Sequence, residues 1–81
     1  MRSKQEMVAM AAAMRKHAKS LPEVDVHGHS NKDDIYLLRC WARALDAVIR
    51  GKEFSDPSGE VEAWLDGDET CDIALAFGDV L

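Results

Sequence analysis

The segment from about Ser30 to Arg50 constrains the fold of this chain more than any other part of the sequence. Its apolar residues recur at helical spacing in two rows: the first is Ile35, Leu38, Ala42, Leu45 and Ile49, and the second is Leu37, Trp41, Ala44 and Val48. A helix on a protein surface needs only one apolar face, so two rows predict a central helix that packs on two sides. We expect this helix to begin near Ser30, with Asp33 and Asp34 in its first turn, and to stop at Gly51.

The short chain, 81 residues, provides enough sequence for one domain, residues 1–81. A domain of this size buries only about 60% of the surface that its unfolded chain exposes, which makes a single chain marginally stable. A symmetric partner can cover surplus apolar surface. We therefore predict a homodimer through the central helix, with an interface made of Ile35, Leu38, Trp41, Ala42, Leu45 and Ile49. The sequence leaves open which of the two rows faces the second chain.

A first helix is predicted from Ser3 to Ser20. Ser3 followed by Glu6 fits a capping box, and Pro22 lies where the helix should stop. The apolar positions of this segment, spaced by three and four, are Met7, Met10, Ala11, Met14, Ala18 and Leu21. A methionine-rich row can serve as a binding surface, but we interpret this one as core.

Two short helices are predicted in the last part of the chain. After a turn at residues 56–59, one should run from about Gly59 to Asp66 and bury Val61, Trp64 and Leu65, and Gly67 should end it. The other should begin at Asp68 as its N-cap and bury Ile73, Ala74, Phe77 and Val80. The predicted fold class is all-α: a small helical bundle in which a long helical hairpin is followed by two short C-terminal helices.

The charges are unevenly distributed along the chain. The net charge is −5, with five basic residues and one acidic residue among residues 1–20, and nine acidic residues between Glu53 and Asp79. An acidic total disfavours non-specific binding to nucleic acid. One interpretation is attraction between the basic and acidic ends, within one fold or across a dimer. The other is a surface that docks a basic partner through Glu60, Glu62, Asp66, Asp68 and Glu69.

The segment Asp25-Val26-His27-Gly28-His29 resembles the first-strand His-x-His motif of amidohydrolase-type metal hydrolases, in which two imidazoles bind a metal. That resemblance covers five residues, and the enzymes need a barrel of roughly 250 residues to supply the other ligands. An 81-residue chain cannot build that barrel, so we predict no enzyme. A weak surface metal site at His27, His29 and Asp25 is kept as an alternative to a plain polar loop.

Other catalytic or ligand-binding motifs fail on spacing. A calcium loop beginning at Asp66 would need Gly and Glu where Cys71 and Phe77 stand. Cys40 and Cys71 lie in apolar helical patterns and are interpreted as buried, inert thiols. We therefore predict no catalytic residue, no structural metal and no cofactor.

The remaining hypotheses concern binding. We predict a small acidic protein-binding module that modulates or inhibits a partner protein with a basic surface; a regulator encoded by a phage or plasmid would fit this description. One alternative is a nucleic-acid-associated regulator or DNA mimic, with the basic first helix as contact surface. Another is a metal-binding protein through the loop of His27 and His29. No apolar run approaches the roughly 18 residues of a membrane span and no signal-peptide pattern is present, so we expect a cytoplasmic protein without membrane contact.

Overall fold

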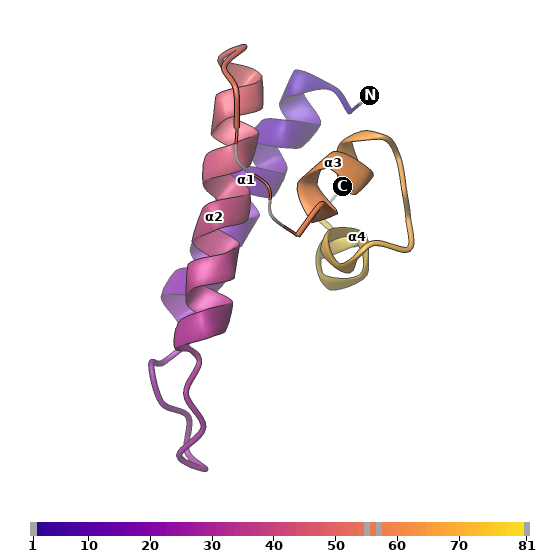
Figure 1. Cartoon of the computed structure of the whole chain (residues 1–81). Helices are drawn as coiled ribbons and strands as arrows, with labels where there is room; N and C mark the ends of the chain where they lie inside the picture. Colours follow the sequence, from indigo (N-terminus) through magenta and orange to yellow (C-terminus); the bar gives the residue numbers. More distant parts are fainter. Residues whose placement is uncertain (1, 55, 57, 81) are drawn as a thin grey trace.

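The computed structural model describes residues 2–54, 56 and 58–80, and within these ranges the chain forms four α-helices. They are α1 (Lys4–Ser20), α2 (Lys32–Ile49), α3 (Glu60–Leu65) and α4 (Asp72–Phe77). Figure 1 shows α1 and α2 side by side as a hairpin, with α3 and α4 packed together on one flank. The predicted all-α class and the order of two long and two short helices are confirmed.

Helix α1 begins as the sequence predicts. The Ser3 side chain accepts a hydrogen bond from the Glu6 backbone N–H (3.1 Å), and the Glu6 carboxylate accepts one from the Ser3 backbone N–H (3.2 Å). This reciprocal capping box satisfies two backbone donors that the first turn leaves without partners. The helix ends at Ser20, two residues before Pro22.

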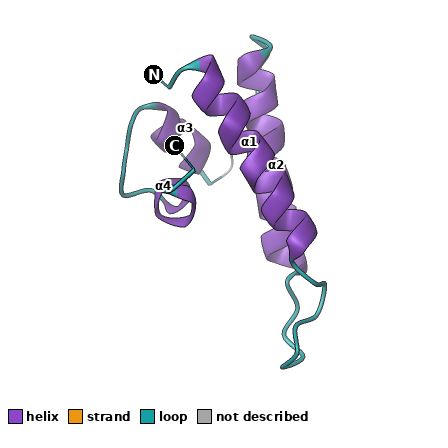
Figure 2. Ribbon diagram, turned by 180° about the vertical axis from the view of Figure 1, so that it is seen from behind, coloured by secondary structure: helices purple, strands orange, loops and turns teal. Residues whose placement is uncertain are grey.

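An eleven-residue loop, residues 21–31, joins α1 to α2 and extends beyond the end of the hairpin, as the teal loop in Figure 2 shows. A single antiparallel bridge between Val24 and Ser30 holds its two sides together. The loop turns at Gly28, whose φ of 81° lies in the left-handed region that glycine adopts without strain.

The start of α2 differs from the prediction by one residue. Asn31 is the N-cap and makes no side-chain capping bond, while the Ser30 hydroxyl accepts a hydrogen bond from the Lys32 backbone N–H (3.3 Å). The bridge at Ser30 keeps that residue in the loop, so the helix begins later. At the other end Gly51 follows the cap residue Arg50 with φ of 70°, and the predicted glycine stop is confirmed.

The start of α4 was predicted wrongly. Its N-cap is Cys71, whose thiol accepts a hydrogen bond from the Ala74 backbone N–H (3.4 Å). Asp68 instead closes a turn of its own, because its carboxylate accepts hydrogen bonds from both the backbone N–H and the hydroxyl of Thr70. The helix dipole of α4 therefore accounts for Asp72 but not for Asp68 or Glu69.

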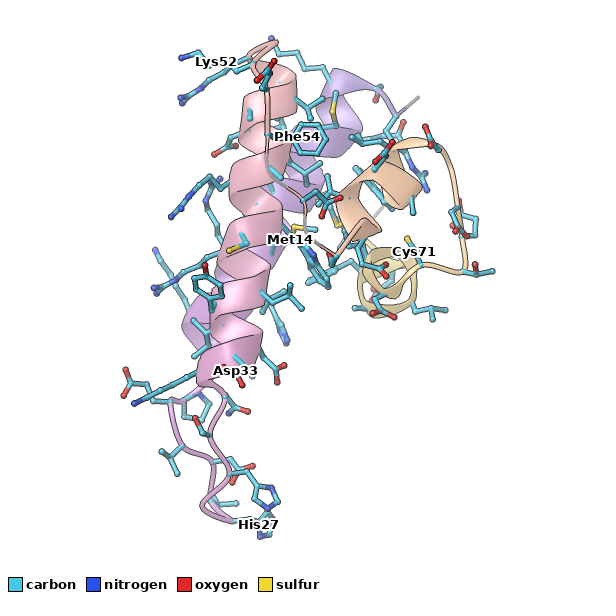
Figure 3. The ribbon with its side chains drawn as sticks, in the orientation of Figure 1. Met14, His27, Asp33, Lys52, Phe54 and Cys71 are labelled. Carbon is cyan, nitrogen blue, oxygen red and sulfur yellow. The ribbon has the colours of Figure 1, made fainter. Side chains whose placement is uncertain are left out.

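One cluster of buried apolar side chains joins all four helices. Figure 3 shows Met14 directed from the hairpin toward the side where α3 and α4 pack. The methionines of α1 are core residues, as predicted, and Trp64 is the largest side chain that is almost completely buried. The buried set is Met7, Met10, Ala11, Met14, Ala18, Leu38, Trp41, Ala42, Ala44, Leu45, Val61, Trp64, Leu65, Cys71, Ile73, Ala74 and Phe77.

The central helix does pack on two sides within a single chain. Of the six residues predicted to form a dimer interface, Leu38, Trp41, Ala42 and Leu45 are buried in this core. The other two, Ile35 and Ile49, are partly buried against it. Much of the apolar surface that suggested a second chain is therefore covered by α1, α3 and α4, and the homodimer stays a prediction.

Candidate functional site: a surface divided by charge

The acidic residues predicted to bind a partner do not form one uniform surface. Three of the five have partners inside the chain: Glu60 accepts a hydrogen bond from the Asp72 backbone N–H (2.7 Å), Asp68 accepts from Thr70, and Glu69 pairs with Arg2 at 3.0 Å. Glu60 thus supports the first turn of α4, and Asp68 supports the turn before it. These three acids are explained by the fold of a single chain.

The other two acids, Glu62 and Asp66, are exposed and stand four positions apart, Glu62 within α3 and Asp66 as its C-cap. Their carboxylates make no hydrogen bond or ion pair in the part of the chain that the structure describes. We call them the α3 acidic pair. Like charges at this spacing repel each other by roughly 0.2–0.5 kcal/mol, so the pair does not stabilise the helix that carries it.

The basic and acidic ends of the sequence meet at Arg2. Its guanidinium pairs with Glu69 and, at 3.4 Å, with Glu6, and it lies 4.8 Å from the centre of the Trp64 ring. Its Nε also donates a hydrogen bond to the Trp64 carbonyl (3.1 Å). Attraction between the two ends within one fold, the first interpretation of the charge distribution, therefore operates at this residue.

The hairpin brings together basic residues that are far apart in the sequence. A groove of about 290 Å³ is lined by Arg15, Ala18 and Lys19 from α1 and by Arg39 and Arg43 from α2. We call this the basic groove. In Figure 3 several nitrogen-tipped side chains project from the side of α2 that faces away from α3 and α4.

One of these four positively charged side chains has an acidic partner. Arg15 forms an ion pair with Asp46 of α2, and this hydrogen-bonded contact raises the pKa of Arg15, so its guanidinium stays charged. Within the described residues, Lys19, Arg39 and Arg43 have no acidic partner. The groove therefore carries three uncompensated positive charges.

The sequence indicates the basic character of the first helix but does not predict a basic surface shared with the second helix. Arg15 and Lys19 are four apart on α1, and Arg39 and Arg43 are four apart on α2, so each pair lies on one helix face. The hairpin prediction put the two helices side by side. The missing information was which faces meet, and that depends on core packing rather than on local pattern.

The histidine loop is organised around Asp25. One oxygen of its carboxylate accepts hydrogen bonds from the backbone N–H groups of His27 (2.8 Å) and His29 (2.9 Å). The two imidazole rings lie 6.4 Å apart and are exposed at the tip of the loop, where Figure 3 labels His27. The carboxylate thus serves first to hold the backbone of the loop. Across the described ranges, no three side chains of His, Cys, Asp or Glu are placed to hold one metal ion.

The two cysteines occupy different environments. Cys71 is buried, as predicted, but Cys40 is only partly buried. Cys40 lines a shallow groove of about 300 Å³ with Tyr36, Ala47 and Phe54. The segment after α2 runs back along that helix, and this places Phe54 beside it (Figures 1 and 3).

Comparisons with protein-family models, with curated proteins and with solved structures found no match. Among the helices of the described chain, none combines the length and the apolar character that crossing a membrane requires.

Proposed function

We propose that this protein is a non-enzymatic interaction module that binds another protein and modulates it. The observation that carries this proposal is the α3 acidic pair: two exposed carboxylates on one short helix, without a compensating cation among the described residues. Every other acid predicted for the docking surface has a structural role. A partner with two cations at matching spacing would relieve the repulsion within the pair.

The position of the pair supports docking. Helix α3 is anchored on its inner side by Val61, Trp64 and Leu65, all buried, so its outer side is held in a fixed orientation. A rigid charged face steers an oppositely charged partner and fixes how that partner approaches. It does this without a catalytic group, which fits the predicted absence of enzymatic activity.

The test is a quantitative pull-down from a native lysate with the wild-type chain and with the double variant Glu62→Lys, Asp66→Lys. We expect the variant to keep its thermal stability and to lose most of the captured protein, with the same loss when salt is raised well above physiological strength. Equal capture by the two proteins would refute the docking role of this pair.

A matched control changes charge elsewhere. Glu53→Lys with Asp79→Lys alters the net charge by the same amount at two exposed positions outside α3. This control should capture the partner as the wild type does. If it loses the partner to the same extent, total charge rather than the α3 acidic pair explains capture, and the proposal fails.

A further inference from the structure

The basic groove gathers three positive charges, those of Lys19, Arg39 and Arg43, that have no acidic partner among the described residues. Lys19 comes from α1, and Arg39 and Arg43 come from α2, so two helices contribute to this groove. Arg39 and Arg43 are separated by about one helical turn, which places their Cβ atoms about 5–6 Å apart on one face of the helix. Arg15, which forms an ion pair with Asp46, lines the same groove from α1.

The groove continues into a second hollow with a different lining. This hollow, about 450 Å³, shares Lys19 and Arg39 with the first and adds the apolar side chains of Leu21, Ile35 and Tyr36. Tyr36 is 71% exposed although it is aromatic. Lys32 and Glu23 also line the hollow, so this part of it carries one further positive and one negative charge. We call the basic groove and this second hollow together the channel. The channel thus presents cations at one end and exposed apolar surface at the other.

We propose that this channel binds an acidic, partly apolar peptide segment of a protein, with carboxylates at Lys19, Arg39 and Arg43 and an apolar side chain beside Tyr36. Guanidinium groups bind carboxylates in a two-pronged geometry, and an acidic helix with Glu four positions apart matches the spacing of Arg39 and Arg43. This surface is separate from the α3 acidic pair and opposite to it in charge. The proposal therefore does not depend on the function proposed above.

A nucleic acid is the competing ligand, and three features of the chain disfavour it. Three free cations are few beside the six to ten phosphate contacts that sustain typical DNA binding. The net charge of −5 repels a long polyanion. Of the described residues that line the two hollows, only Tyr36 is aromatic, and the other apolar side chains there, such as Leu21 and Ile35, are aliphatic, so successive stacked bases would find a single aromatic ring.

Fluorescence anisotropy with three labelled probes tests this proposal: a short helical peptide with Glu at every fourth position and Leu between, the same peptide with Gln for Glu, and oligo-dT of the same charge as the acidic peptide. We expect the acidic peptide to bind in low salt, and the Gln peptide and oligo-dT to bind at least about tenfold more weakly. Tighter binding of oligo-dT would overturn the proposal in favour of a nucleic-acid surface. Failure of the acidic peptide to bind at about 1 mM would also overturn it.

Substitutions of the channel residues test whether the acidic peptide binds there. Arg39→Gln with Arg43→Gln should weaken the acidic peptide by about tenfold or more, and Lys19→Gln on the other helix should weaken it by a smaller factor. The control Arg50→Gln with Lys52→Gln removes two charges at the far end of α2 and should bind within about twofold of the wild type.

Far-UV circular dichroism confirms that each variant is folded, since all these side chains are exposed. Amide chemical-shift changes on adding the peptide should cluster at residues 15–19 and 36–43. Changes centred on α3 or on the loop at His27, or equal losses in the channel variant and its control, would refute the assignment.

Discussion

Arg2 connects the start of the chain to α3 through both its backbone and its side chain. Its backbone N–H donates to the Leu65 carbonyl (3.2 Å), and its guanidinium contacts Trp64, Glu6 and Glu69. The guanidinium is largely covered, so its interactions are less screened than those of an exposed ion pair. We expect Arg2→Ala to lower the free energy of unfolding by about 1–2 kcal/mol, measured by urea denaturation. Lys4→Ala, at an exposed neighbour, should change it by less than about 0.5 kcal/mol.

Glu6, in the first turn of α1, makes the stability of the protein depend on pH. Its hydrogen bonds from Ser3, with a smaller contribution from Arg2, hold the pKa of the Glu6 carboxyl below its ordinary value of 4.5. A lowered folded-state pKa contributes stability above the unfolded pKa, and that contribution is lost as the pH falls through the folded pKa. Glu6→Gln should therefore reduce the loss of stability in acid below about pH 4.5, measured as Tm against pH. An unchanged profile would show that the capping box is not coupled to folding.

Helix α4 has only six residues and depends on its first turn and its packing. The Cys71 thiol accepts a hydrogen bond from the Ala74 backbone N–H and donates one to the Asp68 carbonyl (3.2 Å). Cys71→Ala removes both bonds and should lower the free energy of unfolding by about 1 kcal/mol. Cys71→Ser keeps a capping oxygen and should cost less. If Ala and Ser prove equivalent in denaturant unfolding, the thiol acts only by packing.

The helices that sequence predicts best are those whose ends are fixed by neighbouring residues. The capping box of α1 and the glycine stop of α2 each involve residues within a few positions, so their signals are visible in the sequence. Asp68 is a residue type that often caps helices, which is why the sequence predicted it as the N-cap of α4. In the structure its carboxylate accepts hydrogen bonds from Thr70 instead. The basic groove required knowledge of which faces of α1 and α2 meet, and no local pattern contains that information.

The fold as a whole separates charge across the molecule. The hairpin carries the basic groove, while α3 carries an acidic pair whose members lack partners in the described part of the chain. The molecule is elongated, 39 by 24 by 19 Å, because the hairpin and its loop extend past the two short helices. The two surfaces of opposite sign thus lie on different elements of one small fold, so the docking of a basic partner and the binding of an acidic peptide, both proposed above, can be tested independently.

Substitutions at Leu45 test whether this apolar row of α2 lies in the core of a single chain or at a dimer interface. The Leu45 side chain is 0% exposed in the single chain, within the cluster that draws residues from all four helices. A carboxylate there cannot be hydrated or paired, so we expect Leu45→Glu to give an unfolded chain rather than a folded monomer. Leu45→Ala should fold but lose about 2–5 kcal/mol of stability through the cavity that it leaves.

Circular dichroism and light scattering on the same samples separate the two possibilities. If Leu45 is a core residue of one chain, helicity is lost in Leu45→Glu, and the mass of folded Leu45→Ala equals that of the wild type. A helical Leu45→Glu protein at half the wild-type mass would instead place this row at a dimer interface. A wild-type mass of one chain at micromolar concentration would exclude the predicted homodimer under those conditions. In that case the two apolar rows of α2 are needed for the fold of a single chain.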